Sequence, residues 1–111
     1  MSPIGIITVA TVLLVSGSGS PPFWVQRELC TGLWDQAQRT ERFQAQLTYC
    51  LRLEERSQLY LQWYWTQIPE KVQEDCIREN RRPSYFSLAR CVALRSRDPA
   101  ISNAAPGPTG E

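Results

Sequence analysis

The sequence contains no histidine and a single lysine, Lys71, so the side chains that most often act as general bases or activate nucleophiles are almost absent. A hydrolase would have to rely on carboxylates or on that one lysine. The carboxylate pairs Glu54–Glu55 and Glu74–Asp75 are adjacent in sequence, and neighbours on a helix point about 100° apart, so neither pair can flank one bond. We interpret both pairs as solvated faces. No glycine-rich phosphate loop or nucleophile elbow occurs. The sequence therefore predicts a protein that is not an enzyme and needs no cofactor.

The chain also lacks an excess of charge of either sign. Twelve basic and eleven acidic residues are interspersed and give a net charge of +1, which argues against nucleic acid as a partner. The one local basic cluster contains Arg78, Arg81 and Arg82. Such a short cluster is typical of a solvated helix end, and these arginines are also our candidate rim charges for a partner-binding surface.

No apolar run is long enough for a membrane span, which needs roughly 20 residues. The run from Ile4 to Val15 is uncharged but shorter, and small residues and a Pro-Pro pair follow it. This layout is typical of a signal peptide, although its first residues carry no Lys or Arg. We assign residues 1–19 to the signal peptide and expect a secreted, extracellular protein that passes through the endoplasmic reticulum and keeps no stable membrane span.

There is no Cys-x-x-Cys pair, and together with the missing histidine this argues against a metal site. All four cysteines follow the signal segment, and an even number in a short exported chain is typical of a disulfide framework. Free buried thiols in a cytosolic protein are the alternative. The four candidate disulfide residues are Cys30, Cys50, Cys76 and Cys91.

The pairing can be narrowed by geometry if one helix includes Cys50 and folds back onto the next at Pro69. Cys76 would then lie opposite residues 61–63, about 16 Å from Cys50, whereas bonded cysteines have Cα atoms within about 7 Å. We therefore predict Cys50 paired with Cys91 and Cys30 with Cys76. A bond between Cys30 and Cys91 stays open.

Three helices are predicted. Apolar residues recur at three- and four-residue steps from Leu33 to Arg56, without Pro or Gly, which indicates an amphipathic helix. Residues 59–65 combine a strand-like composition with a position that favours continuing this helix, and we predict helix. Pro69 then favours a second helix over 70–79, with acidic residues at its start and Arg78 near its end. Ser84 is a candidate N-cap for a third helix through about Leu94.

These elements predict an all-α fold, a small irregular three-helix bundle held by two disulfides. The helical disulfide domain covers residues 33–95. Residues 20–32 precede it as an extended segment, because Pro21 and Pro22 favour extended backbone. Residues 96–111 are rich in Pro, Gly, Ala and Ser and are predicted to be a disordered tail.

Large aromatic residues are the most notable feature that remains. A helix through residues 60–65 cannot direct every ring into one small core, so some rings should be exposed. Exposed Trp and Tyr dominate binding hot spots, whereas the alternative is that the rings simply form the core. The predicted partner-binding residues on this stretch are Tyr60, Trp63, Tyr64 and Trp65.

The stretch from Cys76 to Cys91, CIRENRRPSYFSLARC, resembles a segment of the receptor activity-modifying proteins, the accessory subunits of calcitonin-family receptors. That family also places fourteen residues between two cysteines, with a Tyr and a Leu at positions similar to Tyr85 and Leu88. The resemblance implies a disulfide-linked three-helix ectodomain behind a signal peptide and a peptide-hormone receptor as partner. The spacings on either side of Cys50 are longer than in the family, and its third helix has no counterpart after Cys91.

The sequence thus predicts a secreted, non-enzymatic protein-binding module, either a soluble receptor ligand or a receptor accessory protein. A membrane-interface or lipid-binding protein is the alternative from another class, which the near-neutral charge disfavours. The third possibility is a truncated splice form without independent activity.

Overall fold

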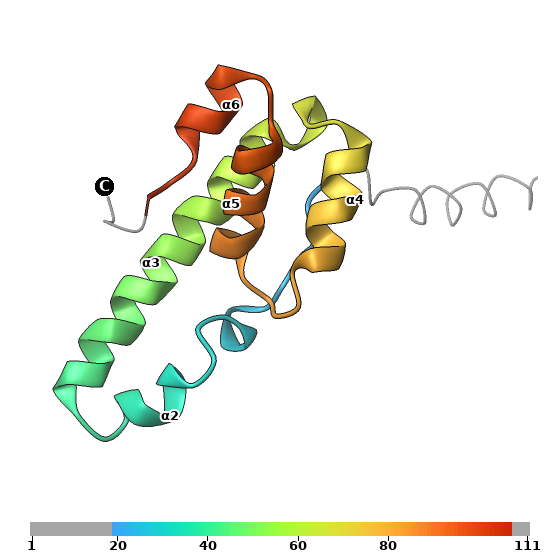
Figure 1. Ribbon diagram of the computed structural model, residues 1–111. Coiled ribbons are helices and arrows are strands. Elements are labelled where there is room, and N and C mark those ends of the chain that lie inside the picture. The colour runs from blue at the N-terminus through green and yellow to red at the C-terminus, as the bar shows by residue number, and fades with distance from the viewer. Residues whose placement is uncertain (1–18, 108–111) are drawn as a thin grey trace, which may run out of the picture.

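The computed structural model describes residues 19–107, and all regular structure in this range is helical (Figure 1). The predicted signal peptide lies outside the described residues except for Gly19. Three longer helices form the bundle: α3 (Glu41–Tyr64), α4 (Glu70–Glu79) and α5 (Tyr85–Arg95). Two short helices, α2 (Leu33–Ala37) and α6 (Pro99–Ala104), pack at opposite ends of α3. The predicted all-α fold with two disulfides is confirmed. No helix in the described range is both long and apolar enough to cross a membrane.

The first predicted helix is interrupted, because Thr40 begins a new helix instead of continuing the old one. Thr40 has extended backbone, and its Oγ1 accepts a hydrogen bond from the backbone N–H of Phe43 at 3.2 Å. This cap satisfies one of the free N–H groups at the start of α3. From there α3 continues through the aromatic stretch to Tyr64, so the prediction of helix over strand was correct there.

The second and third helices have the predicted positions. Pro69 precedes α4, and the Gln73 side chain donates to the backbone oxygens of Trp65 and Ile68 at 2.8 and 3.2 Å, which fixes the turn between α3 and α4. Ser84 caps α5 by accepting from the backbone N–H of Ser87 at 3.1 Å. Both boundaries therefore follow from residues that the sequence identifies.

Glu54 fixes the start of α5 against α3, and our interpretation of this residue as part of a solvated face was wrong. The side chain is 5% exposed. One carboxylate oxygen accepts from the backbone N–H of Tyr85 at 2.5 Å, and the other accepts from the Ser84 hydroxyl at 2.8 Å. A buried anion at a helix N-terminus is stabilised by the free N–H groups there. This contact aligns residue 85 with residue 54, and α5 runs alongside α3 in the same direction (Figure 1).

The disulfides join Cys30 to Cys50 and Cys76 to Cys91, with Cα–Cα distances of 6.1 and 5.7 Å. The predicted pairing was wrong because of the direction of α5. With residue 85 beside Glu54, Cys91 lies level with about residue 60, roughly 15 Å along α3 from Cys50 at 1.5 Å per residue. The α4–α5 hairpin instead brings Cys76 to Cys91.

The predicted disordered tail contains a helix that packs on the core. The Asp98 side chain caps α6 by accepting from the backbone N–H of Ala100 at 3.0 Å, and Pro99 occupies the first turn. Ile101 is 2% exposed, and its carbonyl accepts from the Tyr60 hydroxyl at 2.8 Å. The composition of the segment did not indicate this cap or the single apolar anchor.

The segment predicted to be extended, residues 20–32, is not extended throughout, although Val25 has extended backbone. The short 3-10 helix η2 (Gln26–Glu28) follows. Trp24 packs on Tyr85 with ring centroids 4.9 Å apart, and the Trp24 backbone N–H donates to the Tyr85 hydroxyl at 2.7 Å. Leu29 is buried. This segment is therefore part of the folded unit.

The core lies where α3, α4, α5 and α6 meet. Its members are Leu29, Tyr60, Leu61, Trp65, Ile68, Cys76, Tyr85, Leu88, Ala89, Val92 and Ile101. Because Cys76 is fully buried among them, one disulfide lies inside the core, whereas Cys30 and Cys50 are only partly buried.

Candidate protein-binding surface

The outer face of α3 carries two large apolar side chains in solvent. Trp63 is 75% exposed and Leu59 is 59% exposed, and they lie one helical turn apart. The helical period explains this arrangement: Tyr60 and Leu61 face the core, so residues 59 and 63 must face outward. Nothing in the folding of α3 requires a tryptophan at position 63.

A groove lies beside these two residues. One wall is α3, with Arg56, Leu59 and Trp63, and the other is the chain from the end of α6 through residue 107. Its volume is about 650 Å³. Figure 1 shows this last segment returning along α3 after α6. The groove therefore depends on α6, whose docking holds the second wall in place.

Two arginines on the same side of α3 lack charge partners. Within residues 19–107 the ion pairs are Lys71–Asp75, Arg78–Asp75 and Arg95–Glu79, and neither Arg52 nor Arg56 belongs to any of them. The Nε of Arg56 is buried and has no hydrogen-bond partner in this range. Within this range no acidic side chain therefore neutralises the charge of either guanidinium group.

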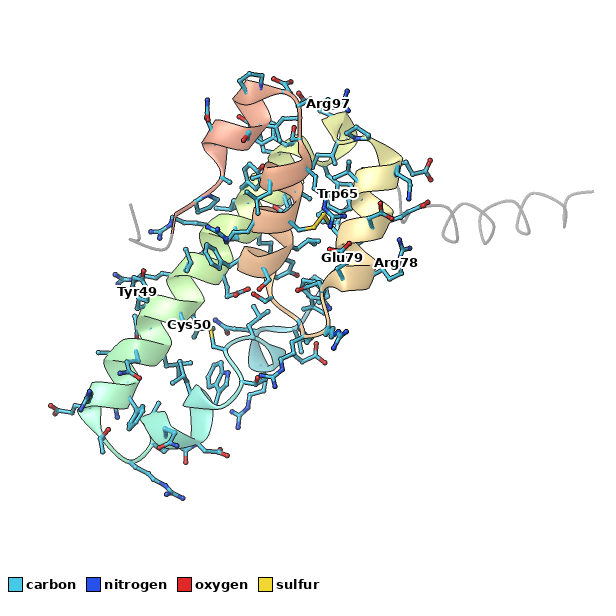
Figure 2. All side chains as sticks on the ribbon, viewed as in Figure 1. Tyr49, Cys50, Trp65, Arg78, Glu79 and Arg97 are labelled. Carbon is cyan, nitrogen blue, oxygen red and sulfur yellow. A yellow bond between two sulfur atoms is a disulfide. The ribbon has the colours of Figure 1, made fainter. Side chains whose placement is uncertain are left out.

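The aromatic stretch divides into two groups, and the prediction that all four rings contact a partner was wrong for two of them. Trp65 is 1% exposed and lies inside the bundle (Figure 2), and Tyr60 is 6% exposed. Tyr64 is partly buried, with its ring centroid 5.3 Å from that of Tyr60. Trp63 is the one member of the four whose side chain is mostly exposed to a partner.

The predicted rim arginines do not lie at this surface. Arg81 and Arg82 are exposed in the loop between α4 and α5. The loop ends at Ser84, which is bound to Glu54, and Glu54 precedes Trp63 by about 13 Å along α3. The structure thus separates the basic cluster from the exposed tryptophan.

Arg78 lies on α4, points away from the bundle and is paired with Asp75 (Figure 2). Asp75 also accepts from Lys71 at 3.1 and 3.0 Å. Hydrogen bonding from Lys71, with a further contribution from Arg78, lowers the pKa of Asp75 below its ordinary value. The charge of Arg78 is therefore already engaged within its own helix.

Sequence reasoning missed Leu59 and Arg56. Both follow the spacing of Trp63, at four and seven residues before it on one helix face. A helical projection of residues 56–63 would have identified them, once residues 60 and 61 were assigned to the core.

A second hollow of about 430 Å³ lies between the N-terminal segment and α3. Its lining includes Phe23, which is 76% exposed, together with Thr48, Arg52 and Glu55.

The described residues contain no group of three or more potential metal ligands. No protein-family model, curated protein or solved structure gives a significant match to this chain.

Proposed function

We propose that this chain is an exported, non-enzymatic protein that binds another protein through the outer face of α3. The observation that carries the proposal is the 75% exposure of Trp63, next to Leu59, at the edge of a groove. Tryptophan is enriched at hot spots because one rigid ring removes a large apolar area from water. Export is supported by the two disulfides, which persist in oxidising compartments.

The chemistry of the groove defines the partner surface that would fit. An apolar side chain of the partner would pack on Leu59 and Trp63, and a carboxylate would pair with the guanidinium of Arg56, which belongs to none of the ion pairs in the described range. Charge complementarity of this kind contributes specificity and association rate. The partner surface is therefore apolar with at least one acidic residue.

A cell-surface receptor is the partner class that we propose. Its basis is the resemblance of the segment from Cys76 to Cys91 to the receptor accessory proteins, and this segment is one disulfide-closed hairpin of α4 and α5. An extracellular protein without a catalytic constellation would act by occupying or completing a receptor. Either role requires a free surface such as the one on α3.

Binding of the labelled protein to a panel of living cells, measured by flow cytometry, tests the proposal. Trp63→Ala should weaken binding by at least tenfold, because a hot-spot truncation costs about 2 kcal/mol or more. Ile77→Ala is the control, since Ile77 is an exposed apolar residue on α4. Binding that survives Trp63→Ala unchanged, or no saturable binding to any cell type, would contradict the proposal.

An exposed tryptophan near unpaired arginines also suits the surface of an anionic bilayer, so lipid binding is the second candidate. Co-sedimentation with phosphatidylserine vesicles separates the two functions. We expect the protein to stay in the supernatant. Sedimentation that is lost in Trp63→Ala would support the lipid-binding function instead.

A further inference from the structure

The two disulfides lie in different surroundings. Cys76 is fully buried inside the core, and its partner Cys91 is partly buried against the same core. Cys30 and Cys50 are both only partly buried, and Cys50 lies on the part of α3 that precedes the contact with α5 at Glu54 (Figure 2). A reductant in solution therefore meets the two bonds under different conditions.

The backbone at Cys30 has a conformation that residues other than glycine seldom adopt. Its φ is 55°, in the left-handed region, and Gly32 follows with φ 95°. A side chain in this region is disfavoured, and such a residue persists where the surrounding structure imposes the conformation. The bond to Cys50 is one of the contacts that hold this turn. Opening the disulfide removes that constraint, which favours the reduced form.

The first disulfide encloses a stretch that has few other anchors. Among residues 31–49 only Ala37 is buried, and no ion pair in the described part of the chain includes a residue of this stretch. α2 packs on the first turns of α3, whereas α5 begins at the level of Glu54 (Figure 1). Low burial of this kind marks the part of a protein that opens most easily. The order of residues 31–49 therefore depends on this bond.

We propose that the Cys30–Cys50 disulfide is a redox switch, reduced by a dithiol oxidoreductase of the thioredoxin type while the rest of the bundle stays folded. A thiolate of the enzyme attacks one sulfur, the S–S bond breaks, and the other sulfur leaves as a thiolate. The second thiol of the enzyme then attacks the mixed disulfide. This chain gains two electrons and two protons, and the enzyme becomes a disulfide. The product has free thiols at Cys30 and Cys50.

The same reaction at the second disulfide is disfavoured in the folded protein. Cys76 is 0% exposed, so a nucleophile cannot reach its sulfur. Attack at Cys91 would expel the Cys76 sulfur as a thiolate among apolar core residues, where an unpaired charge is costly. At the first disulfide, either sulfur leaves from a partly exposed position. The two bonds should therefore differ in reduction rate by at least tenfold.

Reduction should release α2 and the first turns of α3 without disturbing the core. The segment before Cys30 keeps its own anchors, because Leu29 belongs to the core and Trp24 packs on Tyr85. Trp63 lies thirteen residues after position 50 on α3, about 20 Å away at 1.5 Å per residue. Partner binding through Trp63 and the redox switch are therefore independent properties of the fold.

The test treats the native oxidised protein with limiting reduced thioredoxin and, separately, with limiting dithiothreitol. New thiols are alkylated at successive times and located by peptide mapping. Both reductants should expose Cys30 and Cys50 at least tenfold faster than Cys76 and Cys91, and urea, which exposes both bonds, should reduce this difference. Equal rates in the native protein, faster reduction of the second bond, or no reduction of the first bond by thioredoxin would overturn the proposal.

Hydrogen exchange tests the structural consequence, by comparing the oxidised protein with Cys30→Ser/Cys50→Ser. The amides of residues 44–49 should exchange at least tenfold faster in the variant, whereas those of α4 and α5 keep their protection. Thr31→Ala, an exposed position in the same stretch, is the control and should leave both regions unchanged. Wild type that is reduced by thioredoxin and alkylated replaces the variant if the variant does not fold. Unchanged exchange at 44–49, or loss of protection throughout the bundle, would overturn the switch.

Discussion

Truncating Ile101 to Ala tests whether α6 is part of the folded protein. The side chain is 2% exposed and belongs to the same core as Leu61, Trp65 and Val92. The substitution removes three carbon atoms, worth about 0.8 kcal/mol each by transfer, and leaves a cavity that raises the cost, so we expect a loss of about 2–4 kcal/mol. For a domain of this size that corresponds to a decrease in Tm of roughly 10–25 °C.

Urea unfolding monitored by circular dichroism measures this loss, with Asn103→Ala as the control because Asn103 is an exposed residue of the same helix. The control should change the free energy of unfolding by less than about 0.5 kcal/mol. Hydrogen exchange adds a local readout, since the amides of Ile101 and Ser102 both donate to the Asp98 carbonyl at 3.0 Å. If Ile101→Ala costs no more than Asn103→Ala, or if these amides exchange without protection, residues 96–107 form a disordered tail and the groove beside Trp63 loses one wall.

Two further predictions concern buried polar groups. Burial, together with the neighbouring Tyr64, raises the pKa of Tyr60 to about 12 from 10.0. Because the tyrosine of the unfolded chain therefore ionises at lower pH, the free energy of unfolding should fall as pH rises from about 10 to about 12. The decrease should reach about 2–3 kcal/mol. Urea unfolding at pH 9 and pH 11.5 should show a smaller decrease for Tyr60→Phe than for wild type; equal decreases would refute the assignment. Glu54→Ala removes the acceptor of the buried Tyr85 N–H and of the partly buried Ser84 hydroxyl. It should cost about 2–4 kcal/mol in thermal unfolding, against less than about 0.5 kcal/mol for the exposed Glu55→Ala. Equal effects of the two substitutions would contradict the role of this carboxylate.

The local boundaries of the helices were predictable because single residues set them. Pro69 and Ser84 act through their own backbone and side-chain chemistry, so α4 and α5 begin where the sequence indicates. Thr40 acts in the same way, but no Pro or Gly accompanies it. The apolar periodicity continues across Thr40, so we predicted one helix where the structure has two. The cap at Asp98 was hidden by a composition typical of disorder.

The tertiary arrangement of the helices was not predictable by the same reasoning. The disulfide pairing depends on the direction of α5 relative to α3, which the buried carboxylate of Glu54 establishes across thirty residues of sequence. Adjacent acidic residues look alike in sequence, yet Glu54 is buried and Glu55 is exposed. Apolar periodicity predicts which residues share a face of a helix, but which face is buried depends on where the neighbouring helix packs.

The sequence alone determined that this protein is helical, cross-linked and poor in catalytic side chains, because helix period, caps and composition are local properties of the chain. The tertiary structure decided which cysteines meet, that Tyr60 and Trp65 form the core, and that Trp63 remains in solvent. These outcomes depend on how α3, α5 and α6 are placed against one another. That placement is set by contacts between residues far apart in the chain, which no local pattern records.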